Sequence, residues 1–204
     1  RIIVGGNLAA SSEILLRKCR VDVCVAAEGE IPFLNLVRLF SNGGQRSGVQ
    51  GLKRVPGIVF LDENEEVCFM GYERQISAAE LSDPDYGILE QFSNIDGFIG
   101  DPLPRLDFYQ DPRTHEAQRR GKKMGTVVSA KGCVARCTFC HRWDKGFRQL
   151  PVEKVVGRIR YLMERYNVGF IQFGDENFGS DRHALDQLLP ALKQLDVLWH
   201  VGGM

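Results

Sequence analysis

Three cysteines lie within eight positions of one another about two-thirds of the way along the 204-residue chain. They are Cys133, Cys137 and Cys140, spaced Cys-x3-Cys-x2-Cys, and His141 follows directly. Thiolates are ligands for soft metals and for iron–sulfur clusters. Three cysteine ligands leave one iron of a [4Fe–4S] cluster open, and an open coordination position is what metal-centred catalysis requires. The spacing therefore favours a cluster with one accessible iron.

Other interpretations of this loop stay open from the residues alone. The run from Cys137 to His141 satisfies the C-x-x-C-H pattern of c-type haem attachment, but it leaves Cys133 unexplained. The three cysteines and His141 could ligate zinc, although structural zinc sites usually take their ligands as two separated pairs. Cys137 and Cys140 could form a redox pair, which again leaves one cysteine spare. Coincidental packing of three thiols is the weakest interpretation, because a glycine-preceded cysteine cluster is poor core sequence.

Alternating apolar segments on both sides of the loop indicate the elements that position it. Strands are predicted at 124–132, 168–176 and 197–204, the second being an almost continuous apolar run typical of a strand covered on both faces. A helix at 151–166 has Pro151 in its first turn, and another at 180–196 is capped by Ser180 or Asp181. This order predicts half of a (β/α) barrel or the first part of an open α/β sheet.

The N-terminal third shows a second strand–helix alternation. Strands are predicted at 2–5 and 21–30, each followed by a helix, which is the pattern of a parallel sheet. The second helix is expected to bury one face, formed by Phe33, Leu36, Val37 and Phe40. The segment 57–71 reads as a hairpin at the sheet edge.

Residues 74–123 hold four of the eight prolines and are predicted to be an inter-domain connector with short helices at 84–92 and 113–120. The predicted domains are therefore 1–73 and 124–204, joined by this connector. Both chain ends fall within strand-like segments, so we expect the sequence to be a piece of a longer protein.

The composition excludes some partners. The chain has 26 basic and 26 acidic residues, so no global field favours nucleic acid or an anionic membrane, and no apolar run approaches the length of a membrane span. Cys19, Cys24 and Cys68 lie in apolar patterns and are predicted to be plain buried thiols. Clustered thiols suit a reducing compartment, which favours the cytoplasm.

The cysteine loop, with Phe139 before the last cysteine, resembles the signature of the radical S-adenosylmethionine enzymes. The resemblance implies that the open iron chelates the amino and carboxylate groups of S-adenosylmethionine, and that an electron from the cluster cleaves it to methionine and a 5′-deoxyadenosyl radical. It also implies that the next strand end, Gly174, Asp175 and Glu176, binds the cofactor's amino group. From the residues alone, a solvated turn with helix-capping acids is the alternative.

The N-terminal third resembles the last two strand–helix units of a cobalamin-binding Rossmann-like domain. A strand ending in Gly5 and Gly6 lets a ligand approach the backbone, and Glu28, Gly29 and Glu30 fill a second strand-to-helix turn, where acids also serve as caps. Ala27 departs from the Gly-Glu-Gly-Glu turn of that family. The implied fold is α/β: the C-terminal part of such a domain, then the first β/α units of a partial radical S-adenosylmethionine barrel.

This combined resemblance implies an enzyme that uses cobalamin to transfer a methyl group to an unactivated carbon of a small-molecule substrate. An electron donor such as flavodoxin or ferredoxin is the implied protein partner. The alternatives are a cobalamin-dependent radical cyclisation or rearrangement without methylation, and a non-catalytic iron–sulfur or zinc-binding module.

Arg142, Lys145 and Arg148 either meet the cofactor carboxylate or substrate, or form a solvated loop. Trp143 is expected to pack, and His115, His183 and His200 receive no role.

Overall fold

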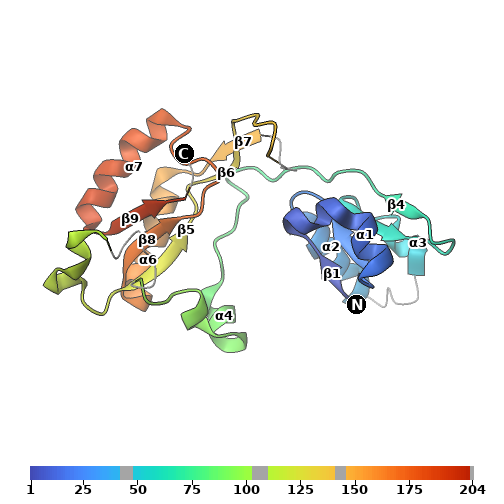
Figure 1. The fold of residues 1–204 in the computed structure, drawn as a ribbon, viewed down its shortest axis with the longest axis horizontal. Coiled ribbons are helices and arrows are strands. Elements are labelled where there is room, and N and C mark those ends of the chain that lie inside the picture. Colours follow the sequence, from blue (N-terminus) through green and yellow to red (C-terminus); the bar gives the residue numbers. More distant parts are fainter. Residues whose placement is uncertain (42–47, 103–109, 141–145, 203–204) are drawn as a thin grey trace. The chain divides into compact units, whose positions relative to one another are not determined.

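The computed structural model describes residues 1–41, 48–102, 110–140 and 146–202. The chain divides into two compact units, which are described separately (Figure 1). One comprises Arg1–Gln75 with Arg136–Lys145, and the other Ile76–Ala135 with Gly146–Met204. His141, Arg142, Trp143 and Lys145, which the sequence placed in the cysteine loop, lie outside the described residues.

The N-terminal unit contains a four-stranded sheet in the order β1-β2-β3-β4. Strands β1 (Ile3–Val4) and β2 (Val23–Val25) are parallel, which confirms the predicted strand–helix–strand alternation. Strands β3 (Ile58–Leu61) and β4 (Val67–Phe69) pair antiparallel, which confirms the predicted hairpin.

Helices occupy the connections from β1 to β2 and from β2 to β3. A 3-10 segment, η1 (Gly6–Ser11), runs into α1 (Ser12–Lys18) after β1, and α2 (Glu30–Ser41) follows β2. A short α3 (Gly48–Leu52) precedes β3. Two separate hydrophobic clusters, one containing residues of α1 and the other residues of α2 and α3, use alternate residues of β2, so both faces of that strand are buried.

Two sequence-based predictions about this unit are wrong. The face predicted for α2 is wrong in part: Leu36 is buried and Phe40 packs against the same cluster as predicted, whereas Phe33 is 51% and Val37 41% exposed and Pro32 is buried. Cys19 is exposed rather than buried, since it follows the last residue of α1. Cys24 is buried as predicted, and Cys68 is half-buried.

The C-terminal unit is built on a parallel sheet in the order β5-β8-β9. Its strands are β5 (Lys123–Val127), β8 (Val168–Phe173) and β9 (Leu198–Val201), and the connecting helices are α6 (Val152–Tyr166) and α7 (Arg182–Leu195). This confirms the predicted β-α-β-α-β order. The structure selects Asp181 over Ser180 as the cap of α7, because its carboxylate accepts a hydrogen bond from the backbone of Ala184.

Both helices cover the same face of this sheet (Figure 1). Their inward stripes repeat every three or four residues, and the strands contribute alternate residues to the same cluster. The cluster is centred on Val155, Ile159, Leu162, Val168, Ile171, Phe173, Leu188 and Leu192, each at most 2% exposed. A packed core of this kind holds the ends of the strands, where the site lies, in fixed positions.

Two further strands, β6 (Ala130–Cys133) and β7 (Gly146–Gln149), were not predicted separately. They form an antiparallel hairpin whose connecting loop carries Cys137 and Cys140. The predicted strand 124–132 is therefore two strands in different sheets, β5 and β6. The cysteine loop is the tip of the hairpin rather than a direct strand-to-helix loop.

The connector predicted at 74–123 groups, from Ile76 onward, with the C-terminal unit. It contains the expected helix, α4 (Tyr86–Phe92), and a 3-10 turn, η2 (Ile95–Gly97). Two more 3-10 turns, η3 (Pro112–His115) and η4 (Ala117–Arg119), replace the helix predicted at 113–120. Arg119, which is 7% exposed, holds this segment by donating to Asp196 Oδ1 at 2.6 Å.

Candidate functional site

The candidate site lies where β5 and β8 end. The residue that joins them is Asp175, the second residue after β8, which is 7% exposed. Its carboxylate accepts hydrogen bonds from the Ser129 backbone N–H at 3.0 Å and the Ser129 hydroxyl at 2.8 Å. It also accepts one from the backbone N–H of Ala130, the first residue of β6. Asp175 therefore connects the end of β8 to the start of the cysteine-bearing hairpin.

Burial raises the pKa of the Asp175 carboxyl, and the hydrogen bonds from Ser129 and Ala130 act in the opposite direction. Its neighbour Glu176 is exposed. The two acids predicted to act together at this strand end thus face different surroundings. Three donor groups already bond to the Asp175 carboxylate, whereas Glu176 and Gly174 are exposed.

Gly174 itself is tied to the neighbouring strand. Its N–H donates to the Val127 carbonyl at 2.9 Å, and a Cβ added to it would lie 3.2 Å from Cγ2 of Thr126. A side chain here would press on β5. The backbone therefore passes close to β5 at the point where the family resemblance places a cofactor contact.

The hairpin brings two glycines into unusually close approach. Gly132 has a left-handed backbone, with φ of +80°, and a Cβ added to it would lie 2.1 Å from the Gly146 carbonyl oxygen. Cys133 pairs with Gly146 in the next register position. Only glycine fits at position 132, so the geometry on which Cys133 depends is encoded by the residue before it.

The three loop cysteines carry free thiols. Cys133 is half-buried, and its sulfur accepts a hydrogen bond from the Ala135 backbone N–H at 3.3 Å. Cys137 and Cys140 are exposed, and the Cys140 N–H donates to the Cys137 carbonyl at 3.1 Å, which forms a tight turn between them. Phe139, within this turn, is 89% exposed.

Cys133 belongs to the C-terminal unit, whereas Cys137 and Cys140 group with the N-terminal one. Within the described ranges, the structure gathers no three His, Cys, Asp or Glu side chains into a metal-binding group. The donor chemistry still suits an iron–sulfur cluster: reduced thiols, two of them exposed, and an N–H···S hydrogen bond of the kind that tunes cluster potentials.

The predicted cobalamin residues lie at the ends of β1 and β2. Gly5 and Gly6 are exposed, Glu28 and Gly29 are half-buried, and Glu30 is the exposed first residue of α2. Added Cβ atoms on Gly5 and Gly29 would both lie beside Val25, at 3.8 and 3.9 Å, in ordinary contact. The two glycines therefore flank the same residue of β2, and packing within the protein does not require glycine at either.

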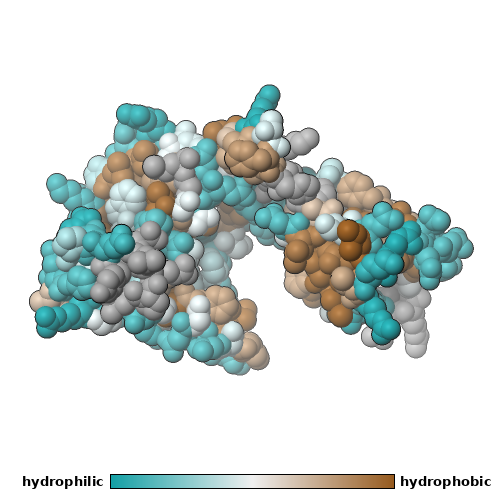
Figure 2. All heavy atoms as spheres, viewed as in Figure 1, coloured by the Kyte–Doolittle hydropathy of each residue, from teal (hydrophilic) through white to brown (hydrophobic). Residues whose placement is uncertain are grey.

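Gly6 differs from these two because its φ is +69°, so its conformation favours glycine. Ala27, where the family resemblance places a glycine, also has a positive φ, of 63°. Two apolar side chains of the segment that follows Gly6 are exposed, Leu8 to 68% and Ile14 to 61%, and Figure 2 shows hydrophobic surface on this unit. Glycine backbone and apolar side chains together suit a large, partly apolar ligand.

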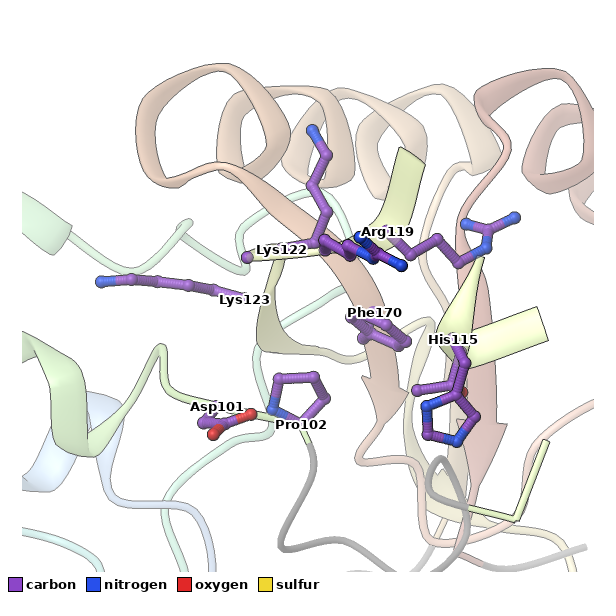
Figure 3. A pocket seen from close by; sticks show the side chains of 10 residues that line it. Asp101, Pro102, His115, Arg119, Lys122, Lys123 and Phe170 are labelled. Atoms are coloured by element: carbon purple, nitrogen blue, oxygen red, sulfur yellow. The ribbon is translucent and has the colours of Figure 1, made fainter. Parts of the chain in front are cut away.

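A cavity of about 540 Å³ lies elsewhere in the C-terminal unit (Figure 3). Lys122 and Lys123, at the start of β5, line it together with Arg119 and Phe170. The cations are paired: Lys122 donates to Asn167, Lys123 to Asp96, and Arg119 to Asp196. This cavity is at the opposite end of β5 from the cysteine hairpin, so it is separate from the candidate site.

Two residues of the site were not anticipated from the sequence. Ser129 connects the sheet to the hairpin, and Gln149 of β7 donates to the Ser129 carbonyl at 2.8 Å. Arg148, which the sequence had singled out, donates to the Ile76 carbonyl at 2.6 Å. The last bond ties the hairpin to the connector, and it gives Arg148 a structural contact. The hairpin could have been predicted only from two short runs of mixed polar and apolar residues that flank the cysteines, "SAKGC" and "GFRQL".

No protein-family model matches the chain. An uncharacterized methyltransferase, PH0819, from Pyrococcus horikoshii is 24% identical over 205 residues, which is 97% of this chain and 38% of that protein. The cytidylyl-2-hydroxyethylphosphonate methyltransferase of Streptomyces wedmorensis is 25% identical over 189 residues, 88% of this chain and 34% of that protein. The chain thus spans little more than a third of these curated relatives.

Solved structures with the same fold are cobalamin-dependent radical S-adenosylmethionine enzymes. The apo form of one, OxsB, matches with a TM-score of 0.66 and 21% identity over 98% of this chain and 25% of its own. The radical S-adenosylmethionine methyltransferase TsrM from Kitasatospora setae, solved with cobalamin and a [4Fe–4S] cluster, matches with a TM-score of 0.58 and 17% identity over 94% of this chain and 34% of its own. The chain therefore resembles this group in fold, as its motifs implied.

In the part of the chain that the structure describes, no helix combines the length and apolarity needed to cross a bilayer.

Proposed function

We propose that this chain is the junction between the cobalamin-binding and radical S-adenosylmethionine portions of a methyltransferase. The observation that carries the proposal is the cysteine hairpin, which follows the first strand of a parallel β/α sheet and is bonded to the end of the next. A zinc module or haem attachment loop has no need of this arrangement. The similarity to methyltransferases in sequence and to cobalamin-dependent radical enzymes in fold supports it.

Cys133, Cys137 and Cys140 would hold a [4Fe–4S] cluster, which when bound supplies the electron for reductive cleavage of S-adenosylmethionine. The exposed Glu176 would accept a hydrogen bond from the cofactor ammonium, with the Gly174 backbone passing beside it. Phe139, which lies between two of these cysteines in the sequence and is 89% exposed, would shield the cofactor from water with its ring.

The N-terminal unit would hold cobalamin across the ends of β1 and β2. Gly5 and Gly29 keep the backbone beside Val25 accessible, and Gly6 provides a turn that a side chain would strain. The start of η1 and of α2 at this same edge presents backbone N–H groups to polar groups of the ligand. Methyl transfer to an unactivated carbon is the reaction class we assign to the whole protein.

The assay for this proposal uses the full-length protein, reconstituted anaerobically with iron and sulfide. Addition of dithionite and S-adenosylmethionine should yield 5′-deoxyadenosine, detected by liquid chromatography and mass spectrometry. With methyl-labelled S-adenosylmethionine, retention of the label on bound cobalamin supports methyl transfer. 5′-Deoxyadenosine with no label on cobalamin would instead support a radical cyclisation or rearrangement. A protein that binds zinc but no iron–sulfur cluster would overturn the proposal.

The cobalamin assignment predicts a separable effect at Gly5. Changing Gly5 to valine should reduce cobalamin retention at least about tenfold. The branched side chain would fill the space in which the ligand approaches the protein backbone. The free energy of unfolding should change little, since the added Cβ would make only an ordinary contact with Val25. Retention is measured by absorbance after gel filtration. The control is Gly157→Val, because Gly157 lies within α6 of the other unit and an added Cβ there would meet no atom within 4 Å. Unaltered retention in Gly5→Val would contradict the assignment.

A further inference from the structure

We propose that Asp175 is a positioning residue, which fixes the cysteine hairpin to the strand end expected to bind S-adenosylmethionine. The inference rests on the proposed function for the role of the hairpin, but the anchoring itself is a property of the polypeptide. The sequence had placed Asp175 among the residues that touch the cofactor. The structure assigns it instead to the support of the loop.

The anchor is a node centred on Ser129. On one side, the Ser129 N–H and hydroxyl donate to Asp175. On the other, the Ser129 carbonyl accepts from the Leu150 N–H at 2.9 Å and from Nε2 of Gln149 at 2.8 Å. Because Ala130 begins β6 and Gln149 ends β7, both strands of the hairpin meet at this node.

The node is closed to solvent. Ser129 is 3%, Ala130 6% and Asp175 7% exposed. In such a place water cannot easily replace a lost acceptor, so removing the carboxylate leaves buried N–H groups without a partner. The node therefore depends on Asp175 in a way that an exposed turn would not.

The neighbours of Asp175 in the sequence couple the hairpin to the end of β8. Its two neighbours are Gly174, whose N–H is bonded to Val127 of β5, and the exposed Glu176. A displacement of the end of β8 must therefore move the first residues of the hairpin, and a displacement of those residues must move the end of β8. Asp175 and Glu176 divide two tasks: the first holds the loop, and the second is left for the ligand.

The test compares Asp175→Ala and Asp175→Asn in the iron-free chain by amide hydrogen exchange. Exchange at Ser129 and Ala130 should be about ten- to a hundredfold faster in Asp175→Ala, the ratio that corresponds to losing a hydrogen bond to a charged acceptor. Asparagine keeps one acceptor oxygen, so Asp175→Asn should fall between alanine and the unmodified protein. If Asp175→Ala does not fold, the asparagine variant alone decides, with faster exchange at these two amides expected.

The matched control is Asp181→Ala. Asp181 also follows β8 and also accepts a backbone hydrogen bond, but from Ala184 in α7. This variant should lose protection at Ala184 and not at Ser129 or Ala130. Unchanged exchange at Ser129 and Ala130 in both Asp175 variants would overturn the anchoring role.

A second measurement distinguishes this inference from the proposed function. After reconstitution, full-length Asp175→Ala should bind less iron than the unmodified protein, and its reduced cluster should give a broadened electron paramagnetic resonance signal, both partly restored by asparagine. If Asp175→Ala shows faster exchange at Ser129 and Ala130 but normal iron content and a normal signal, the positioning of the loop by Asp175 is refuted, and the proposed cluster site still stands. Failure of the unmodified protein to bind a cluster would refute the proposed function, whatever the exchange result.

Discussion

Replacing Cys137 with alanine should abolish both cluster binding and 5′-deoxyadenosine formation in the reconstituted full-length protein. A [4Fe–4S] cluster held by three thiolates has no spare protein ligand, so two cysteines cannot keep it bound through reduction. Iron and sulfide analysis after desalting, together with the 5′-deoxyadenosine assay, measure the loss. We expect both to fall to background.

The control is Cys19→Ala, which removes another exposed cysteine from outside the loop. It should leave iron content and product formation unchanged. The structure offers no other role for Cys137, since its side chain is exposed. The folded state should therefore survive the substitution, and circular dichroism should match the unmodified protein. Full iron content in Cys137→Ala would remove the basis for a three-cysteine site.

The second large effect is expected at Gly132. Changing it to alanine places a Cβ at φ of +80° and 2.1 Å from the Gly146 carbonyl oxygen. The left-handed conformation costs about 1–2 kcal/mol. Relief of the clash requires β6 and β7 to separate, which adds a further cost of about 1–3 kcal/mol typical of overpacking. Urea unfolding measures the sum, and we also expect loss of bound iron, because Cys133 pairs with Gly146 beside the clash.

Gly121→Ala isolates the two contributions. Gly121 has a similar φ of +70°, but an added Cβ would meet no atom within 4 Å. This variant should show the conformational cost alone and should keep its iron. If the two variants lost equal amounts of unfolding free energy, the close approach of β6 and β7 would not be the reason for glycine at position 132.

The helices and the parallel strands could be predicted because burial leaves a periodic trace in the sequence. In β8 a continuous apolar run marks a strand covered on both faces, and the spaced apolar residues of α6 mark a helix packed on a sheet. The error in α2 arose because its apolar residues outnumber those that can be buried. Phe33 and Val37 fit the period as well as Leu36 does, and only packing leaves them exposed and buries Pro32.

The sequence predicted the thiols of the candidate site as ligands, but it did not predict the hydrogen bonds that hold their loop. Three cysteines at this spacing favour an iron–sulfur cluster, and the resemblance to a known signature narrows the alternatives left open by the residues. The hairpin that carries them has strands of four residues with glycines, which give no apolar period. Asp175 bonds to residues 45 and 46 positions away, and an acid after a strand looks the same in sequence whether it faces solvent or a buried loop. Only the fold brings Ser129 to it.

The measurement that tests the central claim most directly is electron paramagnetic resonance of the reduced, reconstituted full-length protein with and without S-adenosylmethionine. A cluster held by Cys133, Cys137 and Cys140 has one iron without a protein ligand, so the cofactor can bind it. We predict a signal typical of a reduced [4Fe–4S] cluster, with g values that shift when S-adenosylmethionine is added. A cluster signal that S-adenosylmethionine leaves unchanged, or the absence of any cluster signal, would contradict the account.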